Sequence, residues 1–344
     1  MKIKNMPTDF ARCVTRFLTS HLPGERNLSP QTIKSYSFAI RMFIGYLDSS
    51  VGIRPERIEL KDITADNIMK FLASMGEADT ISPKTHNQRL SALKTFVRYA
   101  ILEYPAFIQT GQRILAIPSK RSPAHEIVYL EKDAMKALLK APDQKNVRGR
   151  RDLAIIAMLY DTGARIEELI GLKVKDVRLA KPETVTLLGK GRKMRTVPIM
   201  SETAKIVESY MRDRGFLEQA ACSDLYLFNS TNRAQFTRPG IAKILKRYFT
   251  AAKNSNLSAQ FPQDIHPHAL RASKAIHLLE SGVNIIAIRD FLGHASVSTT
   301  QVYLRVNNQA KRDAIAQAYP SLAETVPAWQ ENVDLMALLK ALCS

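Results

Sequence analysis

The sequence predicts a mainly α-helical protein with two domains and one small β-hairpin or sheet. Its length of 344 residues exceeds a typical single domain. Apolar residues recur at helical spacings of three and four over much of the chain, whereas residues 185–199 read as two short strands around a glycine-bearing turn. With 45% hydrophobic and 24% charged residues, the composition is that of a globular protein.

The first third of the chain predicts a bundle of four helices. Ser29-Pro30 and Ser82-Pro83 each place a capping serine before a proline at the first helical position. Core-facing apolar residues follow at helical spacing in both cases: Ile33, Tyr36, Ile40, Phe43 and Leu47 after the first, and Leu90, Leu93, Val97 and Ala100 after the second. A shorter helix is expected to begin at Thr64, and another lies near Phe10 to Leu22.

Basic residues lie on these helices and on the segment that follows them. In the bundle they are Lys34, Arg41, Lys84, Arg89 and Lys94, and in the segment they are Lys120 and Arg121. Such side chains can bind phosphates along a DNA backbone, although a solvated charged face explains the bundle residues equally well. Prolines and small polar residues in 117–123 predict an extended linker. We therefore expect a first domain at 1–115 and a linker at 116–128.

The overall charge favours nucleic acid as the partner. The chain has 50 Lys and Arg against 32 Asp and Glu, a formal net charge of +18, and an isoelectric point near 9.8. This excess attracts a polyanion, but a merely solubilising basic surface has the same composition. The three cysteines, Cys13, Cys222 and Cys343, show no disulfide or metal-site spacing. With no signal peptide or membrane-length apolar window, a cytoplasmic protein without a membrane partner is expected.

The second half of the chain contains the residue types needed to break a DNA strand without a metal. That reaction needs a nucleophile, cations around the phosphate and a proton donor for the leaving oxygen. His268 and Arg271 stand at i and i+3, which places them on one face of a helix. The candidates occur in the order Arg165, Lys190, His268, Arg271, His294 and Tyr303. Each alone has an ordinary explanation as an ion-pairing, packing, capping or turn residue.

These segments together resemble the signature of the tyrosine recombinases, the phage integrase family. The matching motifs are Thr-Gly-Ala-Arg, Gly-Lys-Gly, His-Ala-Leu-Arg, Leu-Gly-His and Ser-Thr-Thr-Gln-Val-Tyr. The front bundle resembles the SAM-like core-binding domain of integrases and Xer-type proteins. The resemblance implies a two-domain, C-shaped clamp around DNA, with a catalytic domain at 129–325.

The resemblance also implies roles for the candidate residues. Tyr303 would be the nucleophile, Arg165 and Arg271 would clamp the phosphate, and Lys190 would protonate the 5′ oxygen. His268 would handle the tyrosine proton, His294 would hydrogen-bond the phosphate, and Glu168 would support the site. No cofactor is implied. Ala272 departs from the many family members that carry a second histidine there, and we expect altered packing rather than lost activity.

The resemblance further implies how the protein assembles on DNA. Double-stranded DNA with inverted half-sites would be bound by a homotetramer on paired sites, alone or with related recombinases, in the prokaryotic nucleoid. Residues 326–344 form a tail whose apolar run Val333 to Leu342 predicts a helix. We expect this helix to dock on a neighbouring protomer, while packing on its own domain fits the apolar pattern equally well.

Two other classes of protein use the same features. A type IB topoisomerase shares the tyrosine chemistry but relaxes supercoils alone, and the Xer-like bundle and apolar tail count against it. A DNA-binding regulator could retain the scaffold without catalysis, and the complete residue set counts against that. The sequence therefore favours a site-specific recombinase, without indicating its DNA site or whether it serves a phage, a transposon, an integron or chromosome-dimer resolution.

Overall fold

The computed structural model describes most of the chain, and it divides the protein into two compact units. The described residues are 6–75, 81–121, 127–189, 191, 193–218, 222–229, 234–256, 259–304 and 333–342. The units are residues 1–125 and 126–344, and each has its own apolar core. Among the described residues, no helix has both the length and the apolar character needed to cross a membrane.

The first unit is a helical bundle. Its α-helices are α1 (Asp9–Arg16), α2 (Pro30–Tyr46), α3 (Ala65–Ser74), α4 (Pro83–Glu103) and α5 (Ile108–Leu115), with a π-helical segment η1 (Phe17–Glu25) extending α1. The predicted caps are confirmed: the hydroxyls of Ser29, Thr64 and Ser82 each accept the backbone N–H three residues later. Helix α5 was not predicted, so the bundle has one more helix than the sequence indicated.

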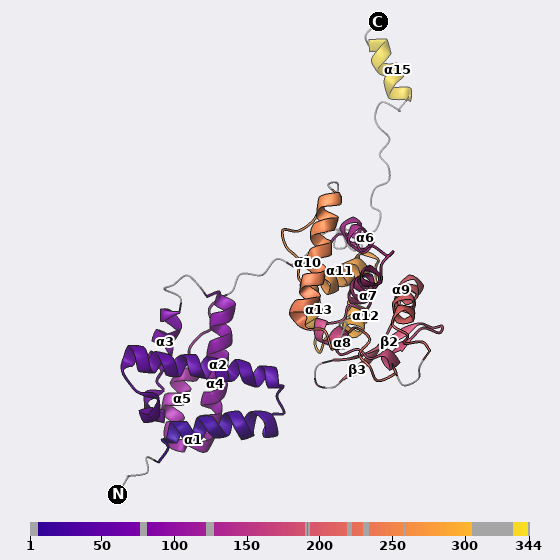
Figure 1. Ribbon diagram of the computed structural model, residues 1–344. Helices are drawn as coiled ribbons and strands as arrows, with labels where there is room; N and C mark the ends of the chain where they lie inside the picture. The colour runs from indigo at the N-terminus through magenta and orange to yellow at the C-terminus, as the bar shows by residue number, and fades with distance from the viewer. Residues whose placement is uncertain are drawn as a thin grey trace. The chain divides into compact units, whose positions relative to one another are not determined.

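Aromatic side chains fill the centre of this bundle. Phe17, Phe43, Phe71 and Phe96 are all buried, and the rings of Phe17 and Phe96 meet edge to face with centroids 5.4 Å apart. Helix α2 packs across α4, as Figure 1 shows. The helical spacing of apolar residues in α2 and α4 therefore serves the purpose predicted for it, which is to form one core.

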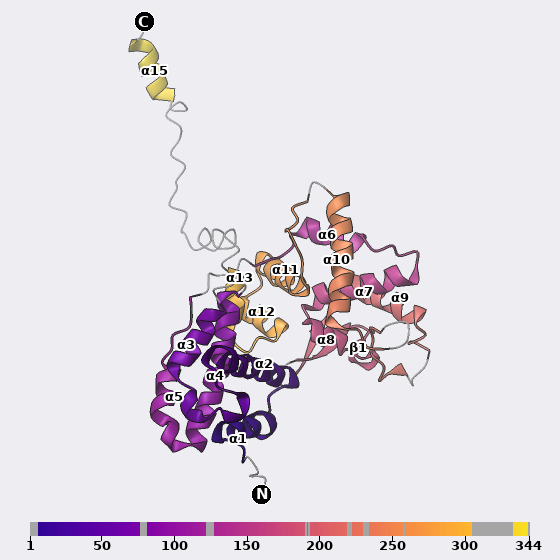
Figure 2. The same ribbon diagram turned by 60° about the vertical axis from the view of Figure 1, so that its left-hand side comes forward.

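The second unit is also mainly helical. Its helices are α6 (Lys132–Lys140), α7 (Val147–Thr162), α8 (Ile166–Ile170), α9 (Ser201–Asp213), α10 (Arg238–Ser255), α11 (Pro267–Glu280), α12 (Ile285–Leu292), α13 (Val297–Leu304) and α15 (Val333–Leu342). Helix α7 is buried along most of its length because it lies between α9 and α11, as both views show (Figures 1 and 2). It therefore forms the centre of this unit, and its C-terminal end leads into Arg165.

A small antiparallel sheet completes this unit. Strands β1 (Val177–Arg178), β2 (Thr184–Leu188) and β3 (Met194–Pro198) follow in the order β1-β2-β3. Val185, Leu187 and Val197 point into the core, as the two-residue period of a strand requires. The predicted hairpin is confirmed, with β1 as an unpredicted third strand. The predicted mainly helical fold class is confirmed as well.

Candidate active site

Two left-handed turns bring distant segments of the second unit together. Gly163 ends α7 with φ +57°, and Gly293 ends α12 with φ +66°, a conformation that a residue with a Cβ rarely adopts. A Cβ on residue 163 would lie 2.7 Å from Leu292 Cδ2, so the two turns are in close contact. Arg165 and His294 follow these turns directly and are therefore presented at one place.

Arg271 joins the same two turns from α11. Its Nη1 donates to the carbonyl of Gly163 at 2.6 Å, and its Nη2 donates to the carbonyl of Leu292 at 2.7 Å. The residue is buried, with 4% of its surface exposed. Burial, together with the nearby Arg165 cation, lowers the pKa of Arg271 to about 10, so the guanidinium stays charged at neutral pH. A buried cation thus lies directly behind the two turns.

A cavity of about 400 Å³ contains five of the six predicted catalytic residues. Its lining includes Arg165, His268, Arg271, His294 and Tyr303, together with Ile127, Val128, His266, Ala272, Thr299 and Val302. Lys190, the sixth, lies outside the described residues; in the sequence it stands between β2 and β3. Ala272, the position that departs from the pattern implied by the resemblance, is buried in the cavity wall. Candidates up to 138 positions apart in the sequence therefore surround one space.

Glu168 lies behind Arg165 as a buried carboxylate. Its Oε1 accepts from Arg165 Nη1 at 2.8 Å, and its Oε2 accepts from the Arg165 backbone N–H at 2.8 Å. Arg195 on β3, which the sequence analysis did not single out as a site residue, pairs with the same carboxylate. Burial alone would raise the pKa of Glu168, but hydrogen bonds from Arg195 and Arg165 outweigh it and hold the pKa at about 2. Glu168 is therefore ionised whenever the protein is folded near neutral pH.

His268 and His294, two of the three histidines that line the cavity, are neutral at pH 7. Burial and the cations Arg271 and Arg165 lower the pKa of His294 to about 4, and its Nδ1 lies 2.8 Å from the hydroxyl of Thr300. Loss of water contact, followed by the charges of His266 and Arg271, lowers the pKa of His268 below its usual 6.5. A neutral imidazole can accept a proton, as the role predicted for His268 requires.

Tyr303 packs its ring into the wall of the cavity. It contacts a small apolar cluster formed by Ala275, Ile288 and Leu292, and its ring stacks near His294 with centroids 6.4 Å apart. Burial raises the pKa of Tyr303 above 10, while the charges of Arg271 and Arg165 act in the opposite direction. To act as a nucleophile, the phenol would therefore have to lose its proton to a neighbouring base.

For the DNA cleavage that the resemblance to tyrosine recombinases implies, these pKa directions predict how the rate changes with pH. Because the pKa of His268 is lowered, its neutral form persists below pH 6.5. We expect a plateau in adduct formation above that pH and a fall of about tenfold per pH unit below the pKa of His268. Single-turnover cleavage of a nicked half-site, measured across this pH range, would test this. In His268→Gln, the fall in rate below the pKa of His268 should be absent. If the rate of this variant still falls at acidic pH as in wild type, another group is the proton acceptor.

The arrangement combines cations, neutral bases and a phenol around one space. A phosphate in the cavity would meet the guanidinium charge of Arg165 and Arg271, which can stabilise negative charge on the nonbridging oxygens. Tyr303 could then attack phosphorus with His268 as proton acceptor. In the described part of the chain, no group of three or more His, Cys, Asp or Glu is placed to hold a metal ion.

Most predicted DNA-binding residues of the first unit lie at its surface. Lys34 and Arg41 on α2, Lys84 on α4, and Lys120 and Arg121 are exposed. Arg89 on α4 and Arg41 both lie over the ring of Phe38, 5.8 and 5.3 Å from its centroid. Helices α2 and α4 thus present cations side by side.

Lys94 differs from the other predicted DNA-binding residues. Its ammonium donates to the backbone carbonyl of Ile117 at 2.5 Å, and burial followed by the charge of Arg98 lowers its pKa. The side chain therefore links α4 to the segment after α5. Its hydrogen bond to the Ile117 carbonyl would have to break before all three of its N–H groups could face a phosphate.

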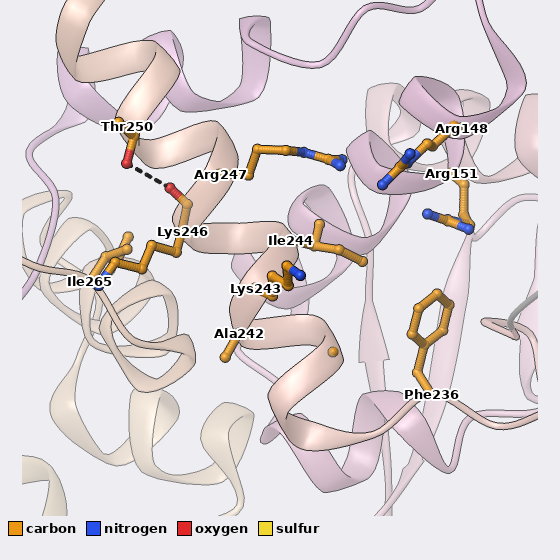
Figure 3. Close-up of a pocket in the computed structure, with 11 residues that line it drawn as sticks. Arg148, Arg151, Phe236, Ala242, Lys243, Ile244, Lys246, Arg247, Thr250 and Ile265 are labelled. Atoms are coloured by element: carbon orange, nitrogen blue, oxygen red, sulfur yellow. Dashed lines mark hydrogen bonds between the residues drawn. The ribbon is translucent and has the colours of Figure 1, made fainter.

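The second unit contains a basic cavity that the sequence analysis did not identify. Its volume is about 660 Å³, and its lining includes Arg148, Arg151, Lys243, Lys246 and Arg247. In Figure 3, Arg247 on α10 extends toward Arg148 and Arg151 on α7. The buried Asp152 pairs with both Arg151 and Arg247. In the sequence, the helical spacing of basic residues along α7 and along α10 could have indicated this cavity. That spacing alone does not show that the two helices are neighbours.

Comparison with protein families identifies both units. Residues 128–310 match the model of the phage integrase family, and residues 14–104 match the N-terminal SAM-like domain of phage integrases. The chain is 31% identical to a putative integrase/recombinase y4rC from Sinorhizobium fredii over 95% of this chain and 96% of that protein. It is 33% identical to a tyrosine recombinase XerD from Halalkalibacterium halodurans, covering 86% of this chain and 94% of the relative.

Solved structures share the fold. The Tn1549 transposon integrase in complex with transposon right end DNA aligns with a TM-score of 0.67 at 17% identity, over 88% of this chain and 98% of that one. The XerH recombinase bound to a palindromic difH substrate aligns with a TM-score of 0.65 at 20% identity, over 85% and 81%. With its family match, its relatives and its fold in agreement, the chain belongs to the phage integrase family of tyrosine recombinases, enzymes that cleave and rejoin DNA.

Proposed function

We propose that the chain recombines two DNA duplexes at specific sites through a covalent 3′-phosphotyrosine at Tyr303. The observation that carries this proposal is the single cavity lined by Arg165, His268, Arg271, His294 and Tyr303. The oxygen of Tyr303 attacks phosphorus, and the bond from phosphorus to the 5′ oxygen breaks. Lys190, the remaining candidate, would protonate that 5′ oxygen.

The covalent bond to tyrosine conserves the energy of the broken phosphodiester. Attack by a free 5′ hydroxyl on the phosphotyrosine then rejoins the strand and releases Tyr303, so the balanced cycle requires neither ATP nor a metal ion. When the attacking hydroxyl comes from the second duplex, the strands are exchanged. Two such exchanges, through a Holliday junction, complete recombination.

A nicked half-site tests this chemistry directly. Cleavage next to the nick releases a short fragment, which prevents religation and traps the enzyme on DNA. We expect an adduct with the 3′ end in the presence of a chelator, with the phosphate attached at residue 303 by peptide mass spectrometry. Absence of any adduct would favour a catalytically silent regulator. If adducts form, recombination of two matched sites distinguishes a recombinase from a topoisomerase, which would relax unrelated plasmids.

The basic surfaces support a duplex partner for both units. We propose that Lys34, Arg41, Lys84 and Arg89 on the bundle, with Lys120 and Arg121 after it, bind the DNA backbone. The cavity between α7 and α10 would add contacts to further phosphates, because five cations line it, whereas two carboxylates, Asp152 and Asp264, pair with three of them. Such contacts hold the protein on DNA without selecting a base sequence.

Neutralising these cations should lower the salt dependence of DNA binding. The double variants Lys34→Gln with Arg41→Gln, and Arg148→Gln with Lys243→Gln, should each reduce the slope of log affinity against log salt by about 0.9 per lost phosphate contact. The slope is measured by titrating a half-site at several salt concentrations. The exposed Lys205 on α9 provides a Lys205→Gln control. Slopes equal to the control would exclude the altered residues as phosphate contacts.

We further propose that the protein acts as a tetramer on paired sites with inverted half-sites, held together by the tail. Helix α15 exposes Leu338, Leu339 and Leu342, of which Leu342 is 76% exposed. Burying this exposed apolar face against a partner would lower the free energy, because it removes apolar surface from water. A groove on a neighbouring protomer would provide that burial and link the subunits.

Removing the tail helix should separate assembly from DNA binding. A chain truncated after Val333 should bind one half-site normally but form fewer complexes on paired sites, as measured by gel shift and sedimentation. Leu338→Asp with Leu342→Asp should have the same effect, whereas Lys340→Gln should not. Equal loss of half-site binding and paired-site assembly in the truncated chain would contradict docking on a neighbour.

A further inference from the structure

Arg195 contacts the active site without lining its cavity. It lies on β3, and its side chain is 13% exposed. Its Nη1 donates to Glu168 Oε1 at 2.9 Å, and its Nη2 donates to Glu168 Oε2 at 2.7 Å. This two-pronged pairing is the arrangement in which a planar guanidinium binds a carboxylate most specifically.

The charges around Glu168 require a second cation. The carboxylate accepts hydrogen bonds from Arg165 as well as from Arg195. Arg165 and Glu168 alone would form a neutral pair, with little charge left to attract a phosphate. With Arg195 present, two guanidiniums share one carboxylate, and the group carries a net charge of +1. Because Arg195 is absent from the lining of the cavity while Arg165 forms part of it, the surplus charge is available at Arg165.

Arg195 also lies against the turn that presents His294. Its Nε donates to the carbonyl of Phe291 at 3.2 Å. A Cβ on Gly293 would lie 2.9 Å from Arg195 Cδ and 3.1 Å from its Nη1. The side chain therefore occupies the space beside this turn, between Glu168 and the end of α12. One residue thus contacts the support of Arg165 and the turn of His294.

We propose that Arg195 is a positioning residue that neutralises Glu168, so that Arg165 keeps its charge and its place for the scissile phosphate beside His294. This rests on the proposed phosphate-binding roles of Arg165 and His294. Loss of Arg195 would leave Glu168 with Arg165 as its remaining guanidinium partner. The Arg165 guanidinium would then pair fully with Glu168, at the expense of the phosphate.

The charge of the scissile phosphate distinguishes this role from a merely structural one. Loss of a structural contact would slow cleavage equally on a charged and on a neutral phosphate. Replacing one nonbridging oxygen by a methyl group gives a neutral methylphosphonate, which needs less cationic stabilisation. Single-turnover cleavage by Arg195→Met should slow by about 100-fold on the phosphodiester but by less than about tenfold on the methylphosphonate, each relative to wild type on the same substrate. Equal slowing on both substrates would overturn the proposal.

Two further variants keep the test decisive if Arg195→Met folds poorly. Arg195→Lys keeps the charge beside Glu168 but loses the two-pronged geometry, and it should show a smaller, still substrate-dependent defect. Glu168→Gln added to Arg195→Met removes the charge that Arg195 neutralised, so it should restore part of the phosphodiester rate. A double variant that is slower than Arg195→Met on the phosphodiester would contradict charge neutralisation.

A matched control separates this effect from the general loss of an ion pair. Arg150 makes a similar two-pronged pair with Asp213 between α7 and α9, at 2.5 and 2.9 Å, outside the site. Arg150→Met should leave both cleavage rates near wild type. If wild type forms no adduct, the proposed function fails. If wild type reacts and Arg195→Met reacts equally fast on the phosphodiester, only the role of Arg195 is excluded.

Discussion

Tyr303→Phe is expected to abolish the covalent adduct with DNA. The substitution removes the attacking oxygen while keeping the ring that packs against Ile288 and Leu292. Removing a catalytic nucleophile lowers the turnover number by a factor on the order of 10⁶, which places the reaction below detection in a gel assay. The nicked half-site measures this by the absence of a slow-migrating band of protein joined to DNA.

A second tyrosine provides the control for this substitution. Tyr226 lies in the same unit with 36% of its surface exposed, and Tyr226→Phe makes the same chemical change. That variant should form the adduct at the rate of wild type. Tyr303→Phe should retain half-site affinity and melting temperature, since only a partly buried hydroxyl is lost. If the adduct still forms in Tyr303→Phe, another residue is the nucleophile.

Arg271→Lys is expected to have the second largest effect. Lysine has one nitrogen in place of the two that reach the carbonyls of Gly163 and Leu292. At least one buried carbonyl therefore loses its partner, which costs about 1–3 kcal/mol. The phosphate also loses a positioned guanidinium, so cleavage should slow by about 10²- to 10³-fold. Single-turnover rates and thermal melting would measure the two effects separately.

Arg289→Lys is the control for Arg271→Lys. Arg289 lies on α12 and pairs with Asp290 at the surface, with its side chain 31% exposed. A surface pair of this kind contributes little to stability, so Arg289→Lys should melt and react like wild type. Should Arg271→Lys cleave DNA at the wild-type rate, the clamp role of Arg271 would be excluded, whatever the change in melting temperature.

The sequence predicted the elements whose signals are local. A capping hydroxyl and a following proline belong to the helix that they begin, so Ser29 and Ser82 marked α2 and α4 correctly. Helix α5 and strand β1 were missed for the converse reason. Helix α5 contains Gly111, which weakens a helical pattern. Strand β1 has two residues, too few to show a period, and it exists because β2 pairs with it.

The sequence predicted which residues form the site, but it predicted few of the contacts between them. Arg165, His268, Arg271, His294 and Tyr303 were identified from their order in the sequence, and the structure places them around one cavity. Their roles stay predictions until the variants are measured. Arg195 could not be found as a partner of Glu168, because that pair depends on how β3 packs beside α8. The basic cavity was missed for the same reason, since it forms where α7 meets α10.

Helices α11 and α13 differ greatly in how firmly they are held. Helix α11 buries most of its residues, Arg271 included, whereas Thr300 is the one buried residue in Val297–Leu304, every residue of which the structure describes. Segments with few buried groups open locally at low free-energy cost. Amide hydrogens of α13 should therefore exchange with solvent much faster than those of α11. Arg271 is therefore expected to stay in place when α13, the helix that carries Tyr303, opens locally.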